Sequence, residues 1–476
     1  MATDKTPLSG REAEQRTLAR LLASKRSEFL AVYGRRRVGK TFLIRRYFSR
    51  HDVTYLEVVG QFGGDTSAQL RIFGESVAET FYDGGPLASP PNWHEGFASL
   101  RRAIERRTSR RGARFVLFFD ELPWIATHRS GFLQELEHFW NAWCSRRSDI
   151  VLIVCGSAAS WMLRRIVNAR GGLHNRLTET TRLLPFTLAE TATYFADRKI
   201  SISPRHVIEL YMVLGGVPHY LDHVERGESV AQTVDRVVLS KDGALADELD
   251  RLYASLFDDD STYVDVIRAL AGKRRGLTRS ELLGATHLKS GGTTTRLLNN
   301  LSEGGFIAAT TPFGRTSRDI VYSLADEFSL FHMKWLAGRR PHSWQDVIGT
   351  PRWHAWAGLS FESLCLKHVA AIERALGISG VRTEASTWLH RDAQIDLLID
   401  RADGVISLCE VKFADGPFVI KKKYANELRS KLAVFRERTG TRKTLHRVFI
   451  TSYGVQPNVH SEELVDREIT MDELLA

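Results

Sequence analysis

The sequence has few cysteines and no hydrophobic run of membrane-spanning length. Only four cysteines occur in 476 residues: Cys144, Cys155, Cys365 and Cys409. They lie too far apart for the spacing of a metal site, so we expect buried thiols in a reducing compartment. The longest apolar runs have the length of a strand, whereas a bilayer-spanning helix needs about 20 apolar residues. The sequence therefore predicts no transmembrane segment.

Targeting signals and repeated sequence are also missing. The first residues, Met1 to Arg11, are polar and lack the apolar stretch of a secretion signal. We find no internal repeat, no low-complexity tract, no amphipathic membrane anchor and no lipidation motif. These absences predict a cytoplasmic protein without a membrane partner.

Positive charge is what the chain has in excess. Its 66 Lys and Arg residues against 56 Asp and Glu residues give a formal net charge of +10. A basic balance favours polyanionic partners, and we expect nucleic acid, specifically DNA, rather than a membrane. Seven arginines surround Glu105 between residues 101 and 114. Two interpretations of this cluster stay open: a solvated helix face, or a surface for nucleic acid or another partner.

A chain of this length divides into about three or four domains. In residues 29–186, apolar runs rich in β-branched and aromatic residues alternate with helical stretches. Such runs indicate a parallel sheet covered by helices on both faces, and hence the α/β fold class. The expected strands are Phe29–Tyr33, Val53–Val59, Phe115–Phe119, Ile150–Cys155 and Thr181–Phe186.

The rest of the chain shows three further patterns. Residues 187–251 are expected to form helices only, with a break at Gly215–Pro218. Residues 262–324 show helix, turn, helix and two short strands, the order of a winged helix-turn-helix with a recognition helix at 292–303. From about Trp353 the order is helix, strand, strand, helix, strand, with strands near 394–399, 406–413 and 447–451. We therefore expect an ATPase core at 1–190, a helical lid at 191–255, a winged helix at 256–340 and a further α/β domain at 341–476.

A phosphate-binding loop stands near the N-terminus. Gly34-Arg35-Arg36-Arg37-Val38-Gly39-Lys40-Thr41 matches G-x-x-x-x-G-K-[ST] at every fixed position. The loop follows an apolar strand and opens a helix, as a phosphate cradle requires. We expect its backbone N–H groups to surround the phosphates of ATP, with Lys40 reaching the β- and γ-phosphates and Thr41 binding Mg²⁺.

Two other strands end in polar residues suited to the same site. Asp120 and Glu121 follow Phe115–Phe119 directly. Asp120 is expected to hold the Mg²⁺ shell, and Glu121 to orient and deprotonate the attacking water. Ser157 follows the next strand, where it either places a hydroxyl near the γ-phosphate or belongs to an ordinary turn.

These motifs resemble the AAA+-like ATPases of the archaeal-ATPase group, relatives of the STAND signalling NTPases. The matching segments are Gly10–Glu12, the phosphate loop, Asp120–Trp124, Gly156–Ser157, Gly171–Arg176 and Gly215–Pro218. The resemblance covers nearly the whole chain and implies the sheet order 5-1-4-3-2, with Gly10–Glu12 and the Gly215–Pro218 element beside the nucleotide. It also implies a homo-oligomer in which an arginine acts on a neighbour's γ-phosphate. Arg176 is the candidate, Arg170 its rival, and a plain surface arginine the alternative.

The C-terminal part carries a second acidic pattern. Asp396 lies in an apolar strand, and Glu410-Val411-Lys412 begins fourteen positions later. Because strand side chains alternate, Glu410 and Lys412 point to one face. Carboxylates on adjacent strands can share Mg²⁺ while a lysine orients water, which is the chemistry of phosphodiester hydrolysis. A structural cluster of ion pairs is the alternative, since charges in apolar strands must be used or paired.

This spacing resembles the D-x(n)-E-x-K pattern of the PD-(D/E)xK, restriction-endonuclease-like fold. The resemblance implies a metal held by Asp396 and Glu410, catalysis aided by Lys412, and an extra acid at Glu362. The chain departs from the fuller pattern at Ile395, where a proline is usual.

Together the patterns predict an ATPase whose nucleotide state controls a DNA-contacting winged helix and a nuclease-like domain. The expected DNA contacts open the recognition helix: Lys289, Thr293, Thr294, Thr295 and Arg296. A winged helix that serves only for packing inside the ATPase is the alternative. The rival function is a STAND-like signalling or scaffolding switch with an inert C-terminal domain.

Overall fold

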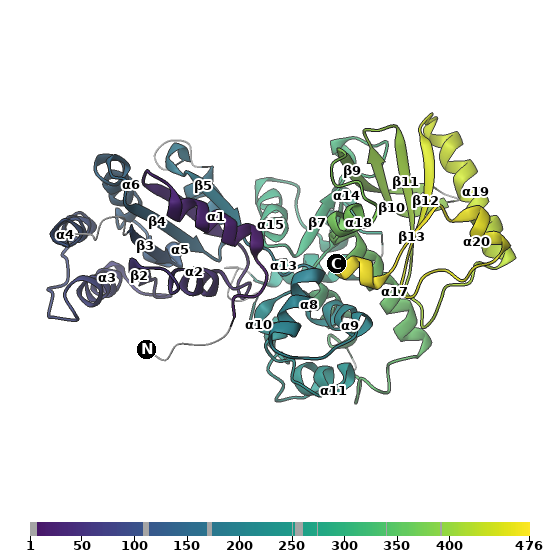
Figure 1. Ribbon diagram of the computed structural model, residues 1–476, viewed down its shortest axis with the longest axis horizontal. Coiled ribbons are helices and arrows are strands. Elements are labelled where there is room, and N and C mark those ends of the chain that lie inside the picture. Colours follow the sequence, from purple (N-terminus) through teal and green to yellow (C-terminus); the bar gives the residue numbers. More distant parts are fainter. Residues whose placement is uncertain are drawn as a thin grey trace. The chain divides into compact units, whose positions relative to one another are not determined.

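The computed structural model describes residues 7–107, 114–168, 174–249, 251–252, 260–273, 275–338, 340–390 and 393–476. The chain forms two compact units, Met1–Leu184 and Pro185–Ala476 (Figure 1). Each unit has its own sheets and its own hydrophobic cores. The finer division of the second unit into three domains stays a prediction.

The first unit is built on a five-stranded sheet in which every neighbouring pair is parallel. Its strand order is β2-β3-β4-β1-β5, which is the predicted order 5-1-4-3-2 counted from the other edge. The strands are β1 Glu28–Tyr33, β2 Val53–Val59, β3 Arg114–Asp120, β4 Ile150–Gly156 and β5 Glu179–Arg182.

The predicted bounds agree within one residue for β1 to β4, but the prediction Thr181–Phe186 for the last strand was wrong. β5 begins at Glu179 and ends at Arg182, and it pairs with β1 alone. It is an edge strand whose side chains are half-buried or exposed, so it lacks the continuous apolar run that marks a central strand.

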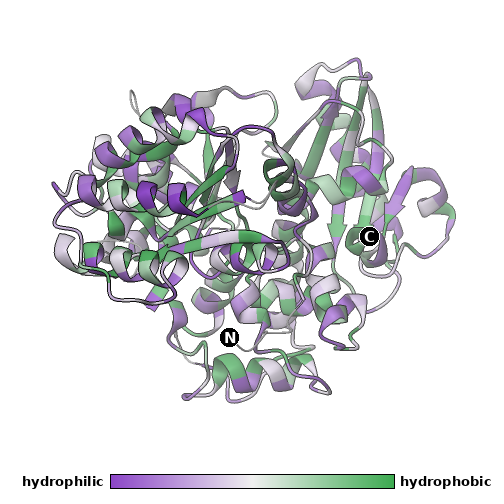
Figure 2. Cartoon of the chain, turned by 60° about the vertical axis from the view of Figure 1, so that its left-hand side comes forward, coloured by the Kyte–Doolittle hydropathy of each residue, from purple (hydrophilic) through white to green (hydrophobic). Residues whose placement is uncertain are grey.

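Helices pack on both faces of this sheet because the side chains of each strand alternate. On β1, Leu30 and Val32 share a core with α1 and α2. Phe29 and Ala31 point the other way and share a core with α3, α4 and α6. Figure 2 shows the strands as the most hydrophobic part of the unit. The helices are α1 Glu12–Ala23, α2 Lys40–Phe48, α3 Thr66–Phe81, α4 Trp93–Arg106, α5 Leu122–Ile125, α6 Phe132–Ala142 and α7 Ala159–Met162.

The described residues of the second unit form two sheets. A three-stranded antiparallel sheet has the order β6-β8-β7, and a mixed five-stranded sheet has the order β13-β12-β11-β10-β9. Their strands are β6 Leu277–Thr278, β7 Ile307–Thr310, β8 Val321–Leu324, β9 Thr383–His390, β10 Ala393–Arg401, β11 Val405–Lys412, β12 Thr444–Thr451 and β13 Arg467–Ile469. The sequence patterns missed β6, β9 and β13.

The helices of the second unit begin as predicted, with helices only from Leu188 to Leu239. The helix expected at 292–303 is present with the same bounds. The helices are α8 Leu188–Asp197, α9 Pro204–Leu214, α10 Pro218–Leu221, α11 Val230–Val234, α13 Asp260–Ala271, α14 Arg279–Thr286, α15 Gly292–Glu303, α16 Glu327–Trp335, α17 Pro351–Lys367, α18 Val369–Ala375, α19 Lys422–Thr439, α20 Val459–Leu464 and α21 Met471–Leu475.

The turn between β7 and β8 is anchored on the five-stranded sheet. The backbone N–H of Phe313 donates to the carbonyl oxygen of Thr387 on β9 at 2.9 Å. The Phe313 ring lies 5.7 Å from the ring of Phe435 on α19, in a cluster that also contains Trp388. The hairpin and the five-stranded sheet therefore share a hydrophobic core.

All four cysteines are buried and free, as expected for small core residues. Burial raises the pKa of the Cys155 thiol well above its ordinary value, which makes this thiol unreactive. Across the described part of the chain, every helix is too short or too polar to cross a bilayer.

Candidate functional site

The phosphate-binding loop connects β1 to α2 through an unusual backbone path. Arg37 and Gly39 have positive φ angles of 69° and 87°. At Gly34, a Cβ atom would lie only 2.2 Å from the carbonyl oxygen of Leu183. The chain that continues from β5 therefore passes so close to the loop that only glycine fits there.

Lys40 folds back into this loop. Its Nζ donates to the carbonyl oxygens of Gly34 at 2.9 Å and Arg35 at 2.8 Å, and the residue is only 6% exposed. Charged phosphate oxygens are stronger acceptors for an ammonium group than neutral carbonyl oxygens. The loop thus holds the Lys40 ammonium group at a position where phosphate oxygens of ATP would take the place of the two carbonyl oxygens as hydrogen-bond acceptors.

The two residues predicted to bind Mg²⁺ are brought together. Thr41 Oγ1 donates to Asp120 Oδ2 at 2.5 Å, and Asp120 Oδ1 accepts from the backbone N–H of Glu121 at 3.0 Å. Nowhere in the described residues do three His, Cys, Asp or Glu side chains form a metal-binding group of their own. A nucleotide-bound Mg²⁺ needs only one or two protein oxygens beside phosphates and waters, so the Thr41–Asp120 pair fits such an ion.

Glu121 and Ser157 also meet at this edge of the sheet. Glu121 Oε2 accepts from the Ser157 hydroxyl at 2.8 Å and from the Ser157 N–H at 3.2 Å. The strands that precede them, β3 and β4, are neighbours. Glu121 has a φ of 49°, a left-handed conformation that costs energy for a non-glycine residue and that clusters at functional sites. The two hydrogen bonds from Ser157 hold the Glu121 carboxylate in one orientation.

Two contacts to the loop were not foreseen. Arg11 is buried, and its Nη2 donates to the carbonyl oxygen of Val38 at 3.1 Å. The Arg36 guanidinium lies 5.4 Å from the centre of the Trp124 ring. The only signal for these contacts is that both residues lie in segments that carry the family resemblance. No spacing rule predicts that Arg11 contacts Val38 or that Arg36 lies over Trp124.

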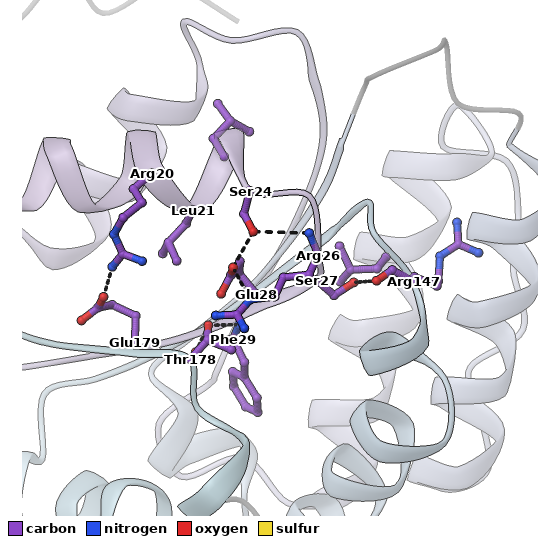
Figure 3. Close-up of polar contacts among 12 residues, drawn as sticks. Arg20, Leu21, Ser24, Arg26, Ser27, Glu28, Phe29, Arg147, Thr178 and Glu179 are labelled. Atoms are coloured by element: carbon purple, nitrogen blue, oxygen red, sulfur yellow. Dashed lines mark hydrogen bonds and ion pairs between the residues drawn. The ribbon is translucent and has the colours of Figure 1, made fainter.

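Arg176 lies at the edge of the sheet opposite the loop. It ends a 3₁₀ turn just before Thr178, whose N–H donates to Phe29 O and whose hydroxyl accepts from Phe29 N, both at 2.9 Å (Figure 3). Phe29 is the second residue of β1 and Gly34 follows the end of that strand, so about 16 Å of extended chain separates the two edges. Arg176 therefore cannot reach the loop of its own chain. Its rival, Arg170, lies outside the described residues.

In the second unit, Asp396 and Glu410 face each other across β10 and β11. The antiparallel register ends with the pair Leu397–Cys409, and Asp396 and Glu410 are the adjacent residues on the two strands. Burial, with smaller contributions from Glu362 and Glu410, raises the pKa of Asp396 to about 6. The three predicted acids are therefore close enough to influence one another.

Glu410 is surrounded by donors. Its Oε1 accepts from Lys431 Nζ at 2.5 Å, and its Oε2 accepts from Tyr424 at 2.7 Å and Lys412 Nζ at 3.4 Å. Although burial acts to raise it, the two lysines hold the pKa of Glu410 below its ordinary value. Lys431 and Tyr424 come from α19 and were not predicted. The sequence of α19 does not show which of its polar side chains face the sheet.

The N-terminal end of α15 agrees only in part with the expected DNA contacts. Lys289, Thr293, Thr295 and Arg296 are exposed. The prediction for Thr294 was wrong: this residue is buried, and its hydroxyl donates to the carbonyl oxygen of Lys289 at 2.7 Å. Helical geometry places it on the core-facing side of α15, one turn before the buried residues 297 and 298.

The sequence and the fold are both similar to those of known proteins. Residues 8–224 match a family described as an ATPase domain predominantly from Archaea. An uncharacterized protein of Methanocaldococcus jannaschii is 23% identical over 414 residues, which cover 85% of this chain and 87% of that protein. The solved structure of a Walker-type ATPase of Pyrococcus abyssi matches with a TM-score of 0.50 at 19% identity, covering 69% of this chain and 96% of the other. At that identity the likeness shows a shared fold. The N-terminal half of the chain thus contains a domain similar to the ATPase domains found predominantly in Archaea.

Proposed function

We propose that the first unit binds ATP with Mg²⁺ and hydrolyses it. The observation that carries this proposal is the convergence of Lys40, the Thr41–Asp120 pair and the Glu121–Ser157 pair at one edge of the sheet. A bound Mg²⁺ would neutralise charge on the β- and γ-phosphates, with Thr41 and Asp120 as its protein ligands. The loop N–H groups and Lys40 bind the phosphates, and Glu121, oriented by Ser157, accepts the proton of the attacking water.

Two substitutions separate binding from hydrolysis. Lys40→Ala should abolish ATP binding, because it removes the cation that contacts the phosphates. Glu121→Gln should keep ATP affinity and stop phosphate release, because an amide cannot accept the proton. Both affinity and phosphate release are measured, with the exposed Lys25→Ala and Glu75→Gln as matched controls. Undiminished hydrolysis by Glu121→Gln would remove Glu121 from the role of base.

We further propose that the nucleotide state controls a DNA-contacting second unit with a nuclease-like site. Support comes from Asp396, whose raised pKa marks a carboxylate that its burial and two neighbouring acids disfavour. A divalent cation would offset that cost. Asp396 and Glu410 are its expected ligands, and Lys412 would position the attacking water. In the hydrolysis, the water oxygen bonds to phosphorus as one P–O bond breaks, and the leaving oxygen takes up a proton from solvent.

The test is cleavage of labelled DNA by the full chain with and without Mg²⁺ or Mn²⁺. Asp396→Ala and Glu410→Ala should abolish cutting through loss of the metal, and Lys412→Ala should abolish it while metal still binds. ATP turnover should survive all three changes, because the two sites lie in different units. Breaking a buried ion pair lowers the free energy of unfolding by roughly 3–5 kcal/mol. If wild type never cuts DNA and the variants only lose stability by this amount, the cluster is structural. The STAND-like switch is then the better description.

A further inference from the structure

A cavity of about 260 Å³ lies between the β7–β8 hairpin and the five-stranded sheet of the second unit. Thr310 and Ser323 line it on the hairpin side, and Ser386 and Gln394 on the sheet side. Asp396 and Glu362 belong to the same lining. Asp396 and the extra acid Glu362 therefore line a chamber that the hairpin covers, whereas Glu410 lines a separate, smaller cavity.

One wall of this cavity is polar. Ser386 is 5% exposed and lines the cavity together with Gln394, whose side-chain amide donates to Asp396 Oδ1 at 3.3 Å. A serine hydroxyl can both donate and accept hydrogen bonds. The wall beside Asp396 therefore suits a ligand that carries hydrogen-bonding groups.

The covering hairpin is fixed in place. The N–H of Phe313 is hydrogen-bonded to β9, and its ring packs beside Phe435 in the core that also contains Trp388. Separating the hairpin from the sheet would expose these aromatic surfaces to water, which is unfavourable. Packing of the hairpin on the sheet therefore fixes the distance between the two walls of the cavity.

We propose that this cavity receives one unpaired nucleotide, so that the Asp396 site acts on single-stranded nucleic acid or on strand ends rather than on an intact duplex. The inference rests on the hydrolytic role proposed above. Pockets for small organic ligands measure roughly 300–1,000 Å³. A cavity of about 260 Å³, just below that range, has room for one nucleotide and not for stacked base pairs. Trp388 gives an aromatic wall, Ser386 and Gln394 give hydrogen-bonding groups for a base, and Arg275 gives a cation for phosphate.

The experiment compares two fluorescent DNA oligonucleotides of one sequence, single-stranded and duplex, with the full-length chain. Binding is measured without divalent ions and cutting with Mn²⁺. Wild type should cut the single strand at least about tenfold faster than the duplex. Ala308→Phe, which fills the cavity from β7, should weaken single-strand binding by about tenfold, equivalent to 1.4 kcal/mol. Ser323→Phe fills the cavity from β8 and should act in the same way if Ala308→Phe misfolds. Ala23→Phe in α1 is the control.

The outcomes separate this inference from the proposed nuclease activity. Equal cutting of duplex and single strand, or unchanged single-strand binding by folded Ala308→Phe, overturns the cavity assignment and leaves hydrolysis standing. Single-strand binding that is weakened about tenfold in the cavity variants, without cutting by wild type, supports the cavity assignment and removes the hydrolytic role. Absence of both binding and cutting overturns both.

Discussion

Asp396 is a carboxyl group whose charged form is opposed by its surroundings. Burial and the nearby acids Glu362 and Glu410 raise its pKa to about 6. Glu410, only one strand away, has its pKa lowered by Lys412 and Lys431. The neighbouring strands β10 and β11 thus hold Asp396, whose ionised form is disfavoured, beside Glu410, whose ionised form is stabilised. Such a difference in pKa is typical of sites where two carboxyl groups have separate roles.

The pH dependence of stability should reveal this difference. At pH 4–6 the folded state binds more protons at Asp396 than the unfolded state does, so stability falls as pH rises through this range. Asp396→Asn removes the effect. Wild type and Asp396→Asn should melt together near pH 4, and the variant should melt at a higher temperature at pH 7.5.

Glu410→Gln provides the contrast of opposite sign. Because the folded pKa of Glu410 is depressed, its contribution to stability is present near neutral pH and is lost as pH falls through the folded value. The Gln variant should therefore melt below wild type at pH 7.5. Thermal melts at both pH values test the pair, and equal melting of wild type and Asp396→Asn at pH 7.5 would show that Asp396 carries no unfavourable charge.

At the scale of elements, α15 carries the DNA contacts that the sequence predicts. Lys289 and Arg296 are exposed near its N-terminus, where the helix dipole also favours anions. Thr293 is exposed between them, whereas Thr294 points into the core. The contact surface is therefore narrower than the run of three threonines suggests.

DNA affinity should depend steeply on salt if α15 binds phosphates, because each neutralised phosphate releases counterions. Replacing Lys289 and Arg296 by alanine should reduce the slope of log K against log salt by about one unit for each phosphate that is no longer neutralised. Replacing Lys25 and Arg50, exposed cations of the first unit, removes the same charge elsewhere and should leave the slope nearly unchanged. Binding that is absent at low salt would favour the signalling switch.

How well a strand or helix could be predicted from the sequence depends on whether its own residues or its contacts with distant residues stabilise it. β3 and β4 are buried along their whole length, and their apolar runs made them predictable. β9 has mostly exposed or half-buried side chains, and β6 has only two residues, so neither leaves a pattern. The phosphate loop was predicted because its chemistry is local. Lys431 and Tyr424 reach Glu410 only once α19 packs on the sheet, and no local rule contains that interaction.

At the scale of the whole molecule, the position of Arg176 has a direct consequence for assembly. Thr178, two residues after Arg176, is hydrogen-bonded to Phe29, and about 16 Å of extended β1 chain separates Phe29 from the phosphate loop. An arginine side chain is far shorter than this distance. Any action of Arg176 on a γ-phosphate therefore requires a second copy of the chain, in a homo-oligomer with shared ATP sites.

Mixing experiments test this arrangement. Arg176→Ala should keep ATP affinity and lower turnover by up to about 10³-fold, the usual scale for such arginines. Mixing it with Glu121→Gln should restore some activity, because a mixed interface joins an intact Glu121 to an intact Arg176. Arg20→Ala, whose side chain pairs with Glu179 near the same edge, is the control. A monomer in sedimentation with normal turnover by Arg176→Ala would contradict the proposal.

The anchoring of Phe313 also affects how such a chain can change during evolution. Its ring packs against a core formed by β9, β10, β11 and α19, whose core residues lie some 75 to 122 positions later in the chain. A genetic exchange that joined the first 340 residues to an unrelated C-terminal segment would leave an aromatic side chain without its packing partners. Such a protein would be less stable, and its exposed hydrophobic surface would favour aggregation. The hairpin and the C-terminal sheet are therefore expected to be inherited together, as one block.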